Sequence, residues 1–295
     1  RTVTATLSDG SNTEVKIISM TSSDANVFAG VNGGIGDPAA VGFRMTDVDV
    51  AFLGLATTAA SDRSSWHALQ AGAESAELVG ATGVTLSVTD LLVQVNGGVD
   101  TSGAGRVVNF SAGDLDGDGD KDGRTTIFVG ASRVDIAFKG SLLEVLGTVT
   151  VVVDGFVHLS GDIAVRLGAT GTAILSDGQT KTVSMLSMAG GNLNLFAGVN
   201  GPANGKGAIG LSVSGVQMAL VLLKPTDGTD TSSYFALVGG ASSAQLVGAS
   251  GVTLTTSNIA IRVNGGTDSQ VARRTIDFSK GDLDNNPDTQ GGTAV

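Results

Sequence analysis

The stretch "LVGATGVTL" at residues 78–86 recurs almost unchanged as "LVGASGVTL" at residues 246–254, so the chain contains a long internal repeat. Aligned with itself at this offset of 168 residues, the chain matches positions 4–120 to positions 172–288 without a gap. The two segments are about 45% identical, far more than a short motif match gives by chance. Loops usually accumulate insertions, so equal loop lengths indicate copies that fit their neighbours in the same way.

The repeat divides the chain into copy one at residues 1–168 and copy two at residues 169–295. Copy two stops at "TQGGTAV" (289–295), which aligns with the interior of copy one. We therefore expect copy two to be truncated and both copies to belong to a longer array of the same unit.

The composition favours stacked β-structure and cationic partners. The chain has 44 glycines and 41% hydrophobic residues, but only 4% of its residues are aromatic. Its formal net charge of −11 opposes binding to nucleic acid or to anionic membrane surfaces. No apolar run reaches the length of a membrane span, so we expect no membrane insertion in this segment. Cysteine is absent, which excludes disulfides and thiolate metal sites.

Alternating apolar and polar residues predict strands along most of the chain. Residues 84–88 alternate in this way, and the pattern resumes at Leu91 after a corner predicted at Thr89 and Asp90. Residues 134–167 show the same alternation, with a predicted change of strand about every eight residues. No helical period extends over a useful window, so the sequence predicts an all-β fold.

Two all-β architectures fit short strands joined by tight corners. We expect a β-solenoid, similar to a parallel β-helix, built from the 168-residue tandem repeats, with each strand stacked on its equivalent one coil below. Hairpins at residues 4–19 and 172–187 would project from this coil. The alternative is a row of tandem antiparallel β-sandwiches, which hairpin signals such as "TLSDGSNTEV" (6–15) favour.

The sharpest local signal for chemistry is "DLDGDGDKDG" at residues 114–123. Alternating carboxylates before a glycine turn are the pattern with which EF-hand-type loops surround Ca²⁺ with oxygen ligands. Val129 stands where such a loop needs its bidentate glutamate, so no complete EF-hand is predicted. We predict a Ca²⁺ site in copy one, and the alternative is a solvated acidic turn. Its candidate ligands are Asp114, Asp116, Asp118, Asp120 and Asp122.

Copy two has a weaker form of this loop, "DLDNNPDTQG" at residues 282–291. Asp282, Asp284 and Asp288 remain as candidate metal ligands, but two carboxylates are lost. Because Ca²⁺ needs six to eight oxygen ligands, the sequence favours a solvated turn over a Ca²⁺ site in copy two.

Two aromatic residues stand at equivalent positions beside serine-rich turns, Trp66 in copy one and Tyr234 in copy two. Aromatic rings at such corners can stack on sugars, so both are candidate ligand contacts. The alternative is an aromatic side chain that covers the corner.

The sequence does not support an enzyme. It has no cysteine nucleophile and no GxSxG elbow, and its two histidines, His67 and His158, do not stand at equivalent positions of the two copies. The glycine-rich "GVNGGIG" (30–36) lacks the strand–loop–helix context of a phosphate loop. We therefore expect no enzymatic activity, with a polysaccharide-active enzyme as a third alternative.

Several segments resemble the tandem β-rich repeats of giant bacterial surface and secreted proteins, which are adhesin-like and fibrous. The resemblance implies an extracellular or cell-surface setting rich in calcium, and it implies no chemistry. The GGxGxDxUx nonapeptide of calcium-binding β-rolls is absent, so that roll is not implied. The segments are "LSDGQTKTVSMLSM" (175–188), "FAGVNGP" (196–202), "LLKPTDGTDTSSYFAL" (222–237) and "LVGASGVTLTTSNIAIRVNG" (246–265).

Together, repeat and resemblance predict a structural segment of an extracellular fibre or cell-surface stalk, stabilised by calcium. Its expected partners are further copies of the same repeat, end to end and side by side. The alternative is an adhesin that binds glycans or surfaces. The two differ in uniformity, because a spacer needs similar faces in every copy and an adhesin needs a specialised one.

Overall fold

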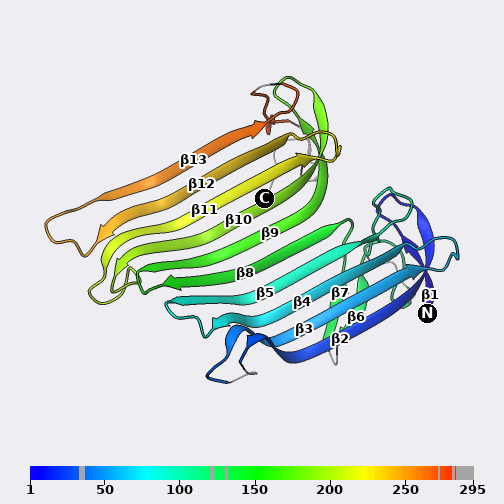
Figure 1. Ribbon diagram of the computed structural model, residues 1–295, viewed down its shortest axis with the longest axis horizontal. Helices are drawn as coiled ribbons and strands as arrows, with labels where there is room; N and C mark the ends of the chain where they lie inside the picture. Colours follow the sequence, from blue (N-terminus) through cyan, green and yellow to red (C-terminus); the bar gives the residue numbers. More distant parts are fainter. Residues whose placement is uncertain (33–36, 120–122, 130–131, 272, 281–282, 284–295) are drawn as a thin grey trace. The chain divides into compact units, whose positions relative to one another are not determined.

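The computed structural model describes residues 1–295 except 33–36, 120–122, 130–131, 272, 281–282 and 284–295, and Figure 1 shows the described chain as strands and loops. The predicted all-β class is confirmed. No helix in the described part of the chain is long and apolar enough to cross a membrane. The strands are β1 (Thr2–Thr6), β2 (Asn12–Val31), β3 (Val41–Thr57), β4 (Ser65–Val79), β5 (Val84–Val99), β6 (Thr125–Val129), β7 (Ser132–Ile136), β8 (Leu142–Val153), β9 (Val157–Ile174), β10 (Thr180–Val199), β11 (Ile209–Pro225), β12 (Ser233–Val247) and β13 (Thr255–Thr267).

Two compact units divide the chain. Unit one comprises Arg1–Ala76 and Thr89–Val145, and unit two comprises Glu77–Val88 and Leu146–Val295. In unit one the sheet order is β1-β2-β3-β4-β5, with β6 and β7 paired as a separate sheet; in unit two it is β8-β9-β10-β11-β12-β13. Neighbours in each sheet follow one another in sequence, which makes each a meander of hairpins. Most of the β8–β9 hairpin belongs to copy one by sequence but packs in unit two with copy two.

The strand pairs whose registers are defined are antiparallel, including β1 with β2, β9 with β10 and β6 with β7. The parallel ladders expected of a solenoid are therefore wrong for these pairs, and the antiparallel pairing of the alternative architecture is confirmed. The physical reason lies in the corners. Asp154 and Gly155 have φ values of 50° and 64°, and Phe156 N donates to Val153 O at 2.9 Å. This is a two-residue hairpin turn, which reverses the chain beside itself.

The strands are also longer than the short segments predicted, because β-bulges interrupt the sequence pattern without ending the strand. The corner predicted at Thr89 and Asp90 lies inside β5, where Asp90 has a φ of 52°. Asp24 in β2 and Asn192 in β10 have φ values of 53° and 51°, beside register shifts in both ladders. A positive φ in mid-strand bends the strand and increases its twist while the chain keeps its direction.

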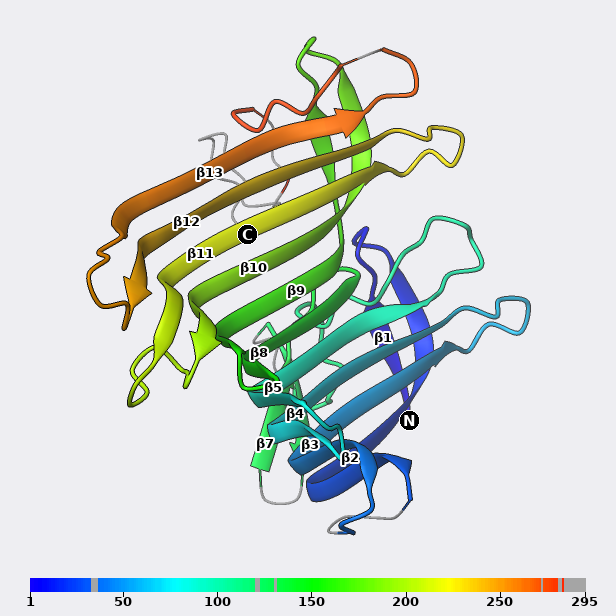
Figure 2. The same cartoon turned by 60° about the vertical axis from the view of Figure 1, so that its left-hand side comes forward.

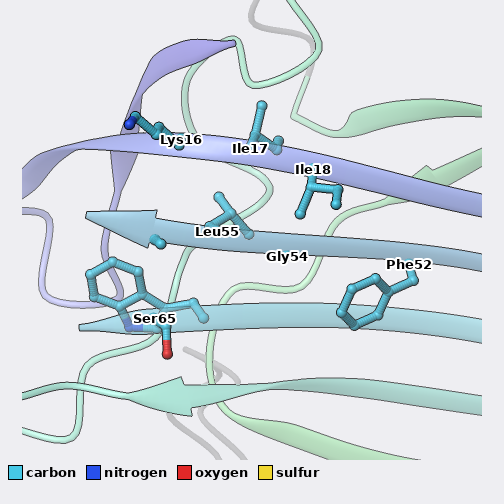
Figure 3. Close-up of a pocket in the computed structure, with 9 residues that line it drawn as sticks. Lys16, Ile17, Ile18, Phe52, Gly54, Leu55 and Ser65 are labelled. Carbon is cyan, nitrogen blue, oxygen red and sulfur yellow. The ribbon is translucent and has the colours of Figure 1, made fainter. Parts of the chain in front are cut away.

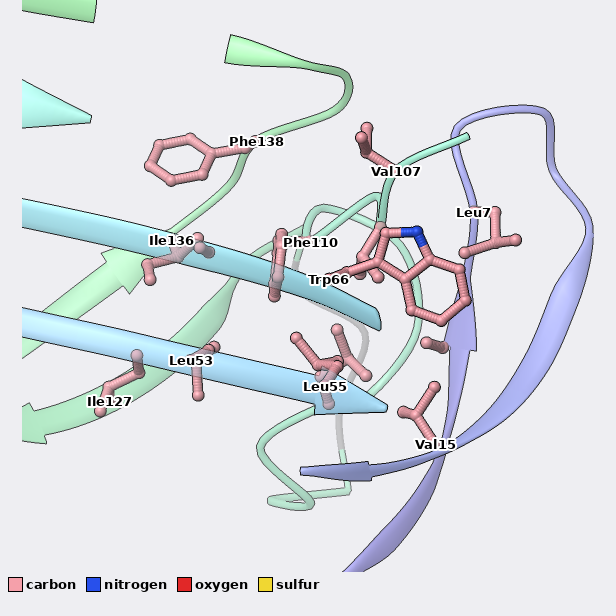
Figure 4. Close-up of a cluster of buried hydrophobic side chains, with 14 of the residues drawn as sticks. Leu7, Val15, Leu53, Leu55, Trp66, Val107, Phe110, Ile127, Ile136 and Phe138 are labelled. Atoms are coloured by element: carbon pink, nitrogen blue, oxygen red, sulfur yellow. The ribbon is translucent and has the colours of Figure 1, made fainter. Parts of the chain in front are cut away.

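Equivalent residues of the two copies build equivalent cores. An isolated bridge joins Leu7 to Val108 in copy one, and its counterpart joins Leu175 to Ile276 in copy two. Figure 4 shows Trp66 of copy one in this core, near Leu7 and Val107. The copy-one core includes Leu7, Val15, Leu55, Trp66, Phe110 and Leu115, and the copy-two core includes Leu175, Val183, Leu223, Tyr234, Ile276 and Leu283.

An asparagine in each copy fastens a loop over this core. Asn96 Nδ2 donates to Val108 O at 2.9 Å, and Asn264 Nδ2 donates to Ile276 O at 2.8 Å. Both asparagines begin the "NGG" triplet that recurs in the sequence. The triplet is thus a structural anchor that holds the segment leading into the acidic loop.

Candidate functional site

The acidic loop of copy one folds around the Asp114 carboxylate. Leu115 is completely buried and anchors the loop to the core. Asp114 Oδ1 accepts a hydrogen bond from Gly117 N at 2.5 Å, and Asp114 Oδ2 accepts one from Gly119 N at 3.1 Å. Gly117 and Gly119 have φ values of 74° and 93°, a region that glycine enters without strain. The two glycines therefore let the chain curl back over the carboxylate.

Three of the predicted metal ligands of copy one lie together in this loop. Carboxylate oxygens of Asp114, Asp116 and Asp118 lie within 4.8 Å of one another. Asp116 is held in place by the start of β6, because its Oδ2 accepts a hydrogen bond from Thr126 N at 2.5 Å. Three carboxylate oxygens at this spacing can contact one hard cation such as Ca²⁺, with water or carbonyl oxygens completing its shell.

The other predicted ligands lie outside the described residues. These are Asp120 and Asp122 in copy one and Asp282, Asp284 and Asp288 in copy two.

A positive charge that the sequence did not indicate lies beside these carboxylates. The Arg1 guanidinium donates from Nη2 to Leu115 O at 2.5 Å and lies against Gly117. Arg1 is 114 residues from Leu115 in sequence, so no local pattern could have indicated it. The guanidinium offsets part of the negative charge of the loop.

The two aromatic corners are buried. Trp66 is 3% exposed, and its Nε1 donates to Arg106 O at 2.8 Å. Tyr234 is 2% exposed, and its hydroxyl donates to Asp268 Oδ2. Rings in these positions present no open face to a sugar. The structure supports the alternative interpretation, in which an aromatic side chain covers the corner.

A buried polar cluster in copy two, which the sequence analysis missed, lies beside Tyr234. The Asp268 side chain is fully buried and accepts hydrogen bonds from Arg274 Nε at 2.6 Å and from the Tyr234 hydroxyl. The Lys181 Nζ lies 3.4 Å from the same carboxylate and 2.6 Å from Asp230 Oδ2. Two cations therefore neutralise two buried carboxylates, which is the condition under which a protein interior tolerates charge.

These contacts shift the pKa values of the cluster. The hydrogen bond from Lys181 lowers the pKa of Asp230. Burial by itself would raise the pKa of Asp268, but hydrogen bonds from Arg274 and Tyr234 outweigh burial and lower it. The hydrogen bond to Asp268 raises the pKa of Arg274. Each group is thus held in its charged form, and the cluster works as a structural brace.

Copy one carries a more exposed version of the cluster. Arg106 Nε donates to Asp100 Oδ2 at 2.8 Å, but the Arg106 side chain is 25% exposed whereas that of Arg274 is 2% exposed. Threonine stands at position 13, the equivalent of Lys181. The recurrence of arginine at aligned positions 106 and 274 is the sequence signal that could have indicated both clusters.

The two histidines have structural surroundings. The His158 ring lies 6.0 Å from the Phe196 ring, and its Nε2 is 3.1 Å from Gly155 O. A Cβ on Gly97 would meet the His67 ring at 3.3 Å, so the absence of a side chain there makes room for this imidazole. Both histidines therefore pack beside strand and turn backbone.

An apolar hollow, the edge hollow, opens on unit one. It has a volume of about 420 Å³ and is lined by Ile18, Phe52, Gly54, Leu55 and Trp66, among others. Figure 3 shows Ile18 on one strand and Gly54 and Phe52 on the neighbouring strand, and a Cβ at Gly54 would meet both side chains. Leucine stands at position 222, the equivalent of Gly54. The absent side chain of Gly54 therefore helps to form the hollow.

No family model, no curated protein and no solved structure matches this chain.

Proposed function

We propose that this chain is a structural repeat segment of an extracellular fibre or cell-surface stalk, with a mechanical role. The observation that carries the proposal is β9, which crosses the boundary between the copies as one strand, with a register shift at Gly168. Residues 157–168 belong to copy one and residues 169–174 belong to copy two. Both parts pair with β10 in one antiparallel ladder. Copy two is thus joined to the preceding sequence by sheet hydrogen bonds, where a linker between independent beads would be flexible.

The copies also share what a spacer needs. Their cores use residues at equivalent positions, and their "NGG" asparagines make equivalent hydrogen bonds. Repeat proteins gain stability from contacts between neighbouring units. The extracellular setting rests on the resemblance to repeats of bacterial surface and secreted proteins, and the expected partners are further copies of the repeat.

Lengthened chains test this proposal. Chains with one, two and three additional 168-residue copies would be compared by small-angle scattering and by electron microscopy. We expect the maximum dimension to rise by the same increment with each added copy, because each copy would be joined to the preceding one through a sheet. A maximum dimension that stays constant, or particles that appear as beads at variable angles, would contradict the proposal.

We also propose that Ca²⁺ stabilises copy one through the acidic loop. The support is the grouping of Asp114, Asp116 and Asp118, because the single positive charge of Arg1 offsets only part of the repulsion among their oxygens. A cation that binds only the folded loop raises stability in proportion to the logarithm of its concentration above Kd.

The test uses Trp66, which is the only tryptophan in the chain and lies in the copy-one core. Millimolar Ca²⁺ should raise the midpoint of the fluorescence transition, and Asp118→Asn should remove most of that rise. Asp37→Asn is the matched control, since it removes one exposed negative charge of the same unit outside the loop. Equal responses of both variants would leave the solvated acidic turn as the explanation.

The alternative of a glycan-binding adhesin has no comparable support, because the rings that suggested it are buried. We therefore propose no catalytic or sugar-binding role for Trp66 or Tyr234.

A further inference from the structure

The strand β2 has one open edge over most of its length. On that side β1 pairs with residues 12–16 of β2, and Ile17 N donates to Arg1 O at 3.0 Å. From Ile18 to Val31 the described part of the chain gives β2 a sheet partner on the β3 side alone. Figure 2 shows β1 beside one end of β2 and not along the rest of it.

The equivalent strand β10 shows the same edge in its occupied form. Its residues 186–197 pair with β9 on one side and with β11 on the other. The effect on burial is large. Phe196 is 2% exposed, whereas its equivalent in β2, Phe28, is half-buried. Ser187 is 8% exposed, whereas its equivalent Ser19 is exposed. The chain therefore contains both the covered and the uncovered state of one edge.

Apolar side chains on the open edge stand where β10 meets apolar side chains of β9. In unit two, Leu186 pairs with Leu167, Met188 with Val165 and Leu195 with Leu159. The equivalents in β2 are also apolar, and they are exposed. Ile18 is 66% exposed, Met20 is 63% exposed and Val27 is 36% exposed.

The edge hollow lies at the same place, because Ile18 forms part of its lining. In the register of unit two, a strand paired with β2 would set a leucine opposite Ile18, since Leu167 is opposite Leu186. That leucine would bury apolar surface at the rim of the hollow, which favours association.

We propose that the open edge of β2, residues 18–29, binds an antiparallel strand with the sequence of β9, residues 157–167, supplied by another copy of this repeat. The inference rests on the proposed function and names the strand through which copies join. Backbone donors are in place. Because Ile17 N points to the β1 side and donors alternate along a strand, Ser19 N and Thr21 N point to the open edge. Strand addition of this kind takes its affinity from main-chain hydrogen bonds and its specificity from alternate side chains.

If the β9–β10 register is applied to β2, one pair of facing residues is unfavourable, and this pair gives a specific test. Asn192 Nδ2 donates to Asp162 Oδ2 at 3.0 Å in unit two. The equivalent of Asn192 in β2 is Asp24, so the incoming strand would set two carboxylates against each other. A peptide with Asp162→Asn should therefore bind better than the unaltered sequence, and Asp24→Asn in the protein should remove the difference.

The experiment measures the binding of a labelled peptide with the sequence of residues 157–168 to the full 295-residue chain by fluorescence anisotropy. We expect saturable binding, tightened about threefold by Asp162→Asn in the peptide. Replacing edge donors by Ser19→Pro and Thr21→Pro should weaken binding about tenfold or more. Trp66 emission checks that these variants keep a folded core, and Ser19→Ala is the control that retains the donor.

Hydrogen exchange with and without peptide locates the site. New protection at residues 18–30 supports the proposal. Protection confined to β13, or loss of protection in β10 through exchange with the chain's own β9, overturns it. Equal binding of a scrambled peptide, or equal affinity of both peptides for wild-type chain and Asp24→Asn, also overturns it. None of these failures affects the lengthening of tandem chains, which tests the proposed function separately.

Discussion

Copy one and copy two build the same core from equivalent residues but differ in how their polar groups are buried. In copy two, Arg274 and Lys181 surround the buried carboxylates of Asp268 and Asp230. In copy one the corresponding arginine is partly exposed, and Thr13 replaces the lysine. The apolar pattern of a repeat thus specifies its fold, while its polar positions are free to give each copy a different stability.

A second difference lies along the bulges. Copy one has four acidic residues where copy two has neutral ones. Asp24 N donates to Asp49 Oδ1 at 3.1 Å, so the backbone of one acidic residue contacts the side chain of another. The copy-one residues are Asp24, Asp47, Asp49 and Glu74, and their equivalents are Asn192, Gly215, Gln217 and Ser242.

Removing the central arginine of each cluster should produce the largest difference in unfolding free energy between the two units. We expect Arg274→Ala to lower the free energy of unfolding of unit two by on the order of 3 kcal/mol, because it leaves the buried Asp268 carboxylate short of a partner. Arg106→Ala should cost unit one less, since its side chain already contacts solvent. Denaturant-dependent hydrogen exchange of β3 and of β11 reads the two units separately. Equal losses of unfolding free energy in the two units would show that burial of the arginine–aspartate pair does not control its contribution to stability.

Acid should destabilise unit two through the same cluster. The pKa values of Asp230 and Asp268 are lowered by folding, so their contribution is present above the ordinary carboxyl pKa of about 3.9 and is lost as pH falls below it. Lys181→Thr, which introduces the copy-one residue, should make the stability of unit two fall less steeply below about pH 4. The measurement is exchange protection of β11 against pH. An unchanged slope would mean that Lys181 does not hold the Asp230 pKa down.

The repeat and the all-β class could be predicted from the sequence because both depend on patterns that extend over many residues. The direction of strand pairing could not, because it depends on single residues. Asp90 in mid-strand and Asp154 in a hairpin both have positive φ values, yet the first preserves the chain direction and the second reverses it. Asp154 is followed by glycine, the stronger hairpin signal, and that difference is where closer reading of the sequence could have favoured antiparallel pairing.

The candidate site was predictable only in its local part. Asp114, Asp116 and Asp118 lie within five residues, so their grouping follows from the sequence alone. Arg1 beside the loop and Lys181 beside Asp268 come from distant segments. Such contacts depend on which distant segments the fold brings together, and no local sequence pattern indicates that.

Filling the edge hollow with a side chain at position 54 should make copy one resemble copy two, which has Leu222 at the equivalent position. A Cβ at Gly54 would meet Ile18 Cγ2 at 3.0 Å and Phe52 Cε1 at 3.3 Å, so both side chains must shift slightly, and the exposed Ile18 can move aside. We expect Gly54→Val to stabilise unit one by about 0.5–1 kcal/mol, because a β-branched residue suits a strand better than glycine. Trp66 fluorescence in denaturant measures the change. Gly30→Ala is the contrasting variant: its Cβ would press on Val41 O, so it should destabilise. Destabilisation by both would mean that the hollow cannot accept a side chain.

The smallest effect is expected where copy one keeps charges that copy two lacks. The pKa of Asp47 is raised, first by desolvation and then by its contacts with Asp24 and the other nearby acids. A raised carboxyl pKa means that folding disfavours the ionised form, so unit one loses stability as pH rises through the pKa of Asp47 and is penalised at neutral pH. Asp24→Asn, which introduces the copy-two residue, should therefore raise the Trp66 melting midpoint by on the order of 1–2 °C at pH 7. The gain should shrink as pH falls and the Asp47 carboxyl takes up its proton. Asp37→Asn removes the same charge away from the bulges and should give no such gain; an equal gain would assign the effect to net charge.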